Sequence, residues 1–94
     1  MRFYRQRVPG GDVKSADVRF SGGEWAEVEM DIHGSDRDLD LVVFDQDGNV
    51  VAEDYYSKGG DGFVRWYVPD GQTYTIVIWN WGFDEDAIVT VYTN

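Results

Sequence analysis

Apolar residues recur at every second position in several short segments of this chain, and that period fits strands rather than helices. The clearest segment is 24–33, in which Ala26, Val28, Met30 and Ile32 share one face and mainly charged residues share the other. This alternation is typical of a strand with one buried and one solvated face, because successive side chains point to opposite sides of a sheet. No segment has the apolar spacing and end caps of an amphipathic helix. The chain is therefore predicted to be all-β.

Six further segments show alternation or short apolar runs between turn residues. They are 38–44, 49–54, 63–68, 73–79 and 87–93, with a weaker one at 13–20. The Asp-Gly pair in 45–49 predicts a hairpin turn, since Gly48 tolerates positive φ, and 69–71 predicts another reversal at Gly71. Trp66 alternates with valines and is predicted to point into the core. About seven short strands at this spacing indicate an antiparallel β-sandwich.

Length and charge exclude several classes of function. Ninety-four residues make one domain, 1–94, and 18 acids against 8 bases give a net charge of −10. Phosphate would repel such a chain, so we expect no nucleic acid and no anionic membrane as a partner. The chain lacks cysteine and has one histidine, which excludes thiolate chemistry and multi-histidine metal sites. No apolar run is long enough for a membrane span or a signal peptide. We expect a monomer.

The charge is uneven along the chain. Residues 1–20 hold five bases and two acids, whereas 21–94 hold three bases and sixteen acids. The opening segment is interpreted as a basic N-terminal strand or as a linker, and it could lie across the acidic body or a neighbouring domain.

An ordered set of motifs covers the remaining three quarters of the chain. Asp-Leu-Asp-Leu at 38–41 precedes Asp45-x-Asp47-Gly48, then Gly71 and Tyr74, then an alternating segment at 87–93. In this order the motifs resemble the bacterial pre-peptidase C-terminal (PPC) domain, over about 24–94. The resemblance implies a jelly-roll-like sandwich of about eight strands within a secreted, extracellular protein. It also implies a non-catalytic module that aids secretion, targeting or substrate attachment, in a family with some members that bind collagen or calcium.

Aspartates near two predicted strand ends are candidate calcium ligands. They are Asp36, Asp38, Asp40, Asp84 and Asp86. Calcium takes six to eight oxygens, so several carboxylates must converge. Alternate residues of a strand stand roughly 6.6 Å apart, so Asp36 and Asp38 would have to precede the strand. The alternative is a solvated face with turn-capping aspartates.

A second candidate site is aromatic. Trp79 and Trp81 fall on the side opposite the predicted core residues of 73–79, and Tyr55 and Tyr56 could extend the same surface. An apolar platform beside acids can hold sugar rings or an extended peptide. The alternative is that the N-terminal segment or a neighbouring domain covers these rings.

Catalysis has little support in this sequence. His33 is predicted at an exposed strand end, and no serine lies in a nucleophile-elbow motif. A sandwich this small leaves no room for a deep cleft. We therefore expect a non-catalytic module that attaches an exported protein to a peptide or carbohydrate polymer, or aids its secretion. The alternatives are a structural spacer or folding aid packed on a neighbouring domain, and a calcium-binding sandwich.

Overall fold

The computed structural model describes residues 1–33, 38–55, 62–82 and 85–94. This part of the chain contains strands and turns without a helix, which confirms the all-β prediction. The strands are β1 (Arg2–Val8), β2 (Val13–Phe20), β3 (Glu24–His33), β4 (Leu39–Phe44), β5 (Val50–Asp54), β6 (Gly62–Val68), β7 (Gln72–Asn80) and β8 (Ala87–Thr93).

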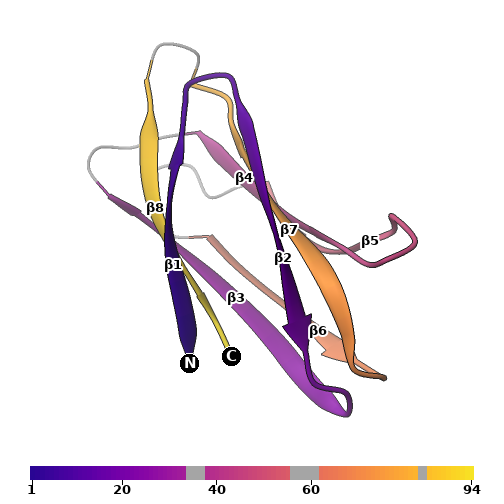
Figure 1. The fold of residues 1–94 in the computed structure, drawn as a ribbon. Helices are drawn as coiled ribbons and strands as arrows, with labels where there is room; N and C mark the ends of the chain where they lie inside the picture. The colour runs from indigo at the N-terminus through magenta and orange to yellow at the C-terminus, as the bar shows by residue number, and fades with distance from the viewer. Residues whose placement is uncertain (34–37, 56–61, 83–84) are drawn as a thin grey trace.

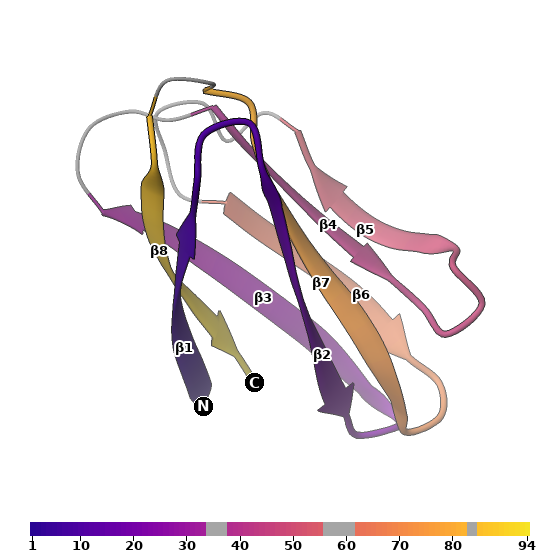
Figure 2. The same cartoon turned by 45° about the horizontal axis from the view of Figure 1, so that its top comes forward.

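The strands form two four-stranded antiparallel sheets. Their orders are β1-β8-β3-β6 and β2-β7-β4-β5, here called the first and the second sheet. This interleaved order is the jelly-roll arrangement of two Greek keys, so the predicted jelly-roll-like β-sandwich is confirmed. The two termini lie side by side, where β1 begins and β8 ends (Figure 1). β5 lies beside β4 at an edge of the second sheet (Figure 2).

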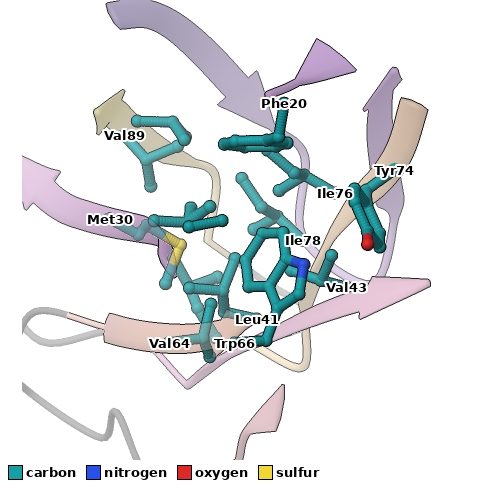
Figure 3. Packing of buried hydrophobic residues seen from close by; sticks show 14 of the residues in the cluster. Phe20, Met30, Leu41, Val43, Val64, Trp66, Tyr74, Ile76, Ile78 and Val89 are labelled. Carbon is teal, nitrogen blue, oxygen red and sulfur yellow. The ribbon is translucent and has the colours of Figure 1, made fainter. Parts of the chain in front are cut away.

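The core lies between the sheets and consists of the residues that alternation predicts. Met30, Leu41 and Ile76 are at most 1% exposed. Trp66 points inward as predicted, and its ring makes edge contacts with Phe20 and Tyr74, each at 5.1 Å between centroids. Figure 3 shows side chains of both sheets meeting in this layer. The outward-facing side chains of both sheets therefore do not contribute to this core.

Two of the turns depend on glycine for different reasons. Gly48 has φ of 83°, as predicted for the hairpin turn, and its N–H donates to the Asp45 carbonyl at 3.2 Å. Gly71, at the second predicted reversal, has no positive φ. Its turn instead packs against Gly22, where an added Cβ would lie 2.6 Å from the Gly71 nitrogen. The close approach of the two backbones therefore requires glycine at position 22.

The linker interpretation of 1–20 is wrong, because this segment supplies one strand to each sheet. β1 pairs with β8 along its whole length, from Arg2 opposite Thr93 to Val8 opposite Ala87. β2 pairs with β7 in the second sheet. The basic segment meets the acidic body where Arg7 forms an ion pair with Asp86.

Candidate functional site

The second sheet carries an apolar groove of about 490 Å³ on its outer face. The groove forms here because outward positions on β4 and β7 hold Val42 and Val77, which pair directly across the two strands. One row further along, Trp79 pairs with Asp40 on one side and with Val13 on the other. The lining residues are Val13, Asp40, Val42, Phe44, Tyr55, Val77, Trp79 and Trp81.

Two tryptophans form the most ordered feature of this groove. The rings of Trp79 and Trp81 stack with centroids 4.4 Å apart and planes 11° apart. They are 42% and 39% exposed, respectively. The Trp81 ring N–H donates to Asp40 Oδ2 at 2.6 Å, and its backbone N–H donates to the Asp38 carbonyl at 2.8 Å. The pair is thus fixed in place before any ligand arrives, which lowers the entropic cost of binding.

A buried amide holds the chain between the two rings. Asn80 is fully buried, and its Nδ2 donates to the carbonyls of Val8 at 3.0 Å and Glu85 at 2.8 Å. Its Oδ1 accepts the Gly82 N–H at 2.9 Å. Asn80 therefore ties the end of β1 to the β7–β8 connection that carries Trp81. Sequence reasoning missed this residue, although it continues the inward-facing series of β7.

Among the described residues that line the groove, Asp40 is the one carboxylate. Partial burial raises its pKa, and the negative charges of Asp38 and Asp54 raise it further, whereas the hydrogen bond from Trp81 acts in the opposite direction. The hydrogen bond between Tyr55 and Glu53 raises the pKa of the Tyr55 hydroxyl. The described lining of the groove therefore combines aromatic faces, an aliphatic floor and the acidic acceptor Asp40.

The structure brings three of the four predicted aromatic site residues to this groove. Trp79, Trp81 and Tyr55 line it, and Tyr56 lies outside the described residues. The alternative in which the N-terminal segment covers the rings is wrong. β2 lies beside β7 within the sheet, so that Val13 flanks Trp79 and leaves both rings exposed.

The predicted calcium ligands fall into different situations. Asp36 and Asp84 lie outside the described residues. Asp40 accepts the Trp81 hydrogen bond, and Asp86 accepts from the Arg7 side chain and from the Gly10 N–H. The hydrogen bond from Arg7, above all, lowers the pKa of Asp86. Within the described ranges, no group of three or more His, Asp or Glu side chains could hold a metal ion. Calcium binding stays a prediction.

Comparison with known proteins adds no relative to these observations. The chain matches no protein-family model, and no curated protein matches it. The resemblance to PPC domains is thus carried by the motifs alone. Among the described residues, no helix is long and apolar enough to cross a membrane.

Proposed function

We propose that this domain is a non-catalytic binding module that attaches its parent protein to a polysaccharide through the groove of the second sheet. The observation that carries the proposal is the stacked Trp79–Trp81 pair, exposed on one side and hydrogen-bonded to Asp40. Large aromatic rings that are fixed and half-exposed beside other apolar residues mark a binding surface. The resemblance to PPC domains supports an exported, secreted parent for such a module.

The chemistry of the lining favours a sugar polymer. The apolar C–H face of a sugar ring packs on an indole face, while its hydroxyls need polar partners at the rim. Asp40 supplies an acceptor in the same row of the sheet as Trp79. Val42 and Val77 would lie beneath the sugar rings as an aliphatic floor.

The position of the groove favours a carbohydrate over an extended peptide. An extended peptide commonly binds at a sheet edge, where unpaired backbone groups extend the hydrogen-bond ladder. This groove lies on the face of the sheet over β4 and β7, which are both central strands whose backbone groups pair on both sides. A ligand here must therefore be recognised by side chains, as a sugar is.

The proposal is tested by measuring tryptophan fluorescence during titration with soluble polysaccharides and by co-sedimentation with insoluble ones. We expect Trp79→Ala and Trp81→Ala each to weaken binding by about ten-fold or more. Trp25→Ala is the matched control, because Trp25 is 50% exposed but lies on the other sheet. All variants are first compared by melting temperature to confirm folding.

Three outcomes contradict the proposal. The first is no binding to any neutral polysaccharide in the panel. The second is an equal loss of binding in the Trp25 control. The third is binding of an extended peptide in the groove in place of a sugar. Absence of all binding would leave the structural-spacer alternative, in which the groove meets a neighbouring domain.

A further inference from the structure

The outer face of the first sheet exposes a second set of large apolar side chains that the proposed function does not use. They are Phe3, Trp25, Phe63, Tyr67 and Ile88, with exposures between 40% and 69%. A groove of about 580 Å³ lies on this face, lined in part by Glu29, Asp31, Phe63 and Tyr92. A single sheet face with this much exposed apolar surface is typical of a protein–protein contact.

Charges of opposite sign flank the middle of this face. The registers place Arg5 on β1 and Asp31 on β3 in one row, on either side of Thr90 on β8. Two strand spacings, about 10 Å, separate the backbones of the two charged residues. No ion pair joins Arg5 to a described residue, and Asp31 Oδ1 is buried without a hydrogen-bond partner. Each sheet thus carries an exposed basic residue and a partly buried acidic residue, one strand to either side of β8.

We propose that a second copy of this chain docks on this face, with the two first sheets stacked about a two-fold axis parallel to β8. Such an axis places β1 of one copy over β3 of the other. Arg5 of each copy then faces Asp31 of its partner, twice per dimer, as an isologous interface requires. The contact also covers Phe3 on β1 and Ile88 on β8, whereas β6 and the Trp25 end of β3 lie outside the overlap.

The mixture of charges argues for a copy of the chain over other occupants. A uniformly basic partner would be repelled by Arg5 on β1 and by Arg65 on β6, and an acidic one by the carboxylates of β3. A surface that carries a positive and a negative charge on opposite sides of β8 is electrostatically complementary to a second copy of itself. Thr90, in the middle of the row, is buried, and its hydroxyl lies 2.6 Å from His33 Nε2.

The small area of the overlapping faces limits the affinity of the dimer. Seven residues at about 3.3 Å by the three overlapping strands at about 4.8 Å give a projected face of roughly 330 Å² per copy. A standard stable interface buries about 800 Å² of accessible surface per partner. We therefore expect a weak dimer with a Kd on the order of micromolar to tens of micromolar.

Sedimentation velocity from micromolar to millimolar concentration measures this equilibrium. Arg5→Glu and Asp31→Arg should each weaken self-association by about ten-fold or more, because each homodimer then holds two like-charge contacts. Mixing the two variants should restore a dimer, since both contacts of the heterodimer again join opposite charges. Arg19→Glu, on the outer face of the second sheet, is the matched control and should leave the equilibrium unchanged.

The mixing experiment separates the proposal from a simple loss of folding. If Asp31→Arg does not fold, as judged by melting temperature, an Arg5→Glu, Asp31→Lys double variant replaces the mixture, because both contacts of its homodimer again join opposite charges. The double variant alone should dimerise, and Arg5→Glu alone should not. A chain that stays monomeric at millimolar concentration overturns the proposal. Failure of a folded pair of complementary variants to restore the dimer overturns it equally.

Discussion

Replacing Asn80 with aspartate tests whether one buried amide holds the chain on both sides of the tryptophan pair. The change keeps the side-chain shape but removes both N–H donors, so the carbonyls of Val8 and Glu85 would face a carboxylate oxygen. A buried carbonyl left unpaired costs about 1–3 kcal/mol. The Val8 bond is buried and the Glu85 bond is part-buried, so we expect a loss of about 3 kcal/mol in the free energy of unfolding.

Thermal unfolding followed by circular dichroism measures this loss. For a domain of this size about 1 kcal/mol corresponds to roughly 4–8 °C, so the melting temperature should fall by about 12–24 °C. Asn94→Asp is the matched control. Its amide also donates to a backbone carbonyl, that of Trp25 at 2.8 Å, but the contact is exposed and water can replace it. We expect less than about 1 kcal/mol there.

A second readout addresses the groove directly. Two indole rings stacked at 4.4 Å couple their electronic transitions, and the resulting circular dichroism signal depends on their relative orientation. Asn80→Asp should weaken this signal at temperatures where the variant is still folded, because Trp81 follows Asn80 in the chain. If the variant melts within a few degrees of Asn94→Asp, the reasoning about Asn80 is wrong. If it melts early with an unchanged signal, Asn80 stabilises the fold without positioning Trp81.

Two other changes test the turns. Gly22→Ala should lower the free energy of unfolding by about 1–3 kcal/mol in urea, because its Cβ would meet the Gly71 backbone at 2.6 Å. Gly23→Ala is the control, because Gly23 has φ of 76° but an added Cβ would meet no atom within 4 Å. It should cost only the backbone strain of about 1 kcal/mol. Equal losses of stability in the two variants would contradict the packing argument. The hydrogen bond from the Asn49 backbone lowers the pKa of Asp45 below its ordinary 3.8. The ionised Asp45 carboxylate therefore stabilises the fold above pH 3.8, and this stabilisation is lost as the pH falls through the lower pKa of the folded state. Asp45→Asn should make the melting temperature fall less steeply at acid pH. An unchanged acid dependence of the melting temperature would refute this.

The strands with clear alternation could be predicted because a strand's side-chain period is a local property. In β3 the inward positions carry Ala26, Val28 and Met30, and all three are buried. β1 gives no such signal. Its inward positions include Tyr4 and Gln6, both only partly buried, while Phe3 points outward and is 69% exposed. Its strand character comes from pairing with β8, a contact between the two ends of the chain that no local pattern reveals.

The candidate site was predictable to the same extent. Alternation places Trp79 opposite the core, and the structure agrees. The role of Asp40 could not be derived, because its partner Trp81 comes from a strand connection far along the chain. Asn80 reads as a turn residue in the sequence, and only the fold brings Val8 within reach of its amide. The face of the sheet to which a side chain points can thus be predicted from sequence, whereas its hydrogen-bond partners from distant parts of the chain cannot.

The two proposed surfaces lie on opposite outer faces of one sandwich, and this placement determines what a dimer could do. Stacking the first sheets leaves both grooves on the outside of a four-layer assembly, facing in opposite directions. With sheets about 10 Å apart, roughly 30 Å separates the two outer sheets. One polysaccharide chain cannot lie in both grooves without passing around the whole assembly, so the second groove must engage a separate chain. Dimerisation would therefore increase retention on a surface of many chains, by raising the effective concentration of the second site, and would add nothing to the affinity for a short oligosaccharide.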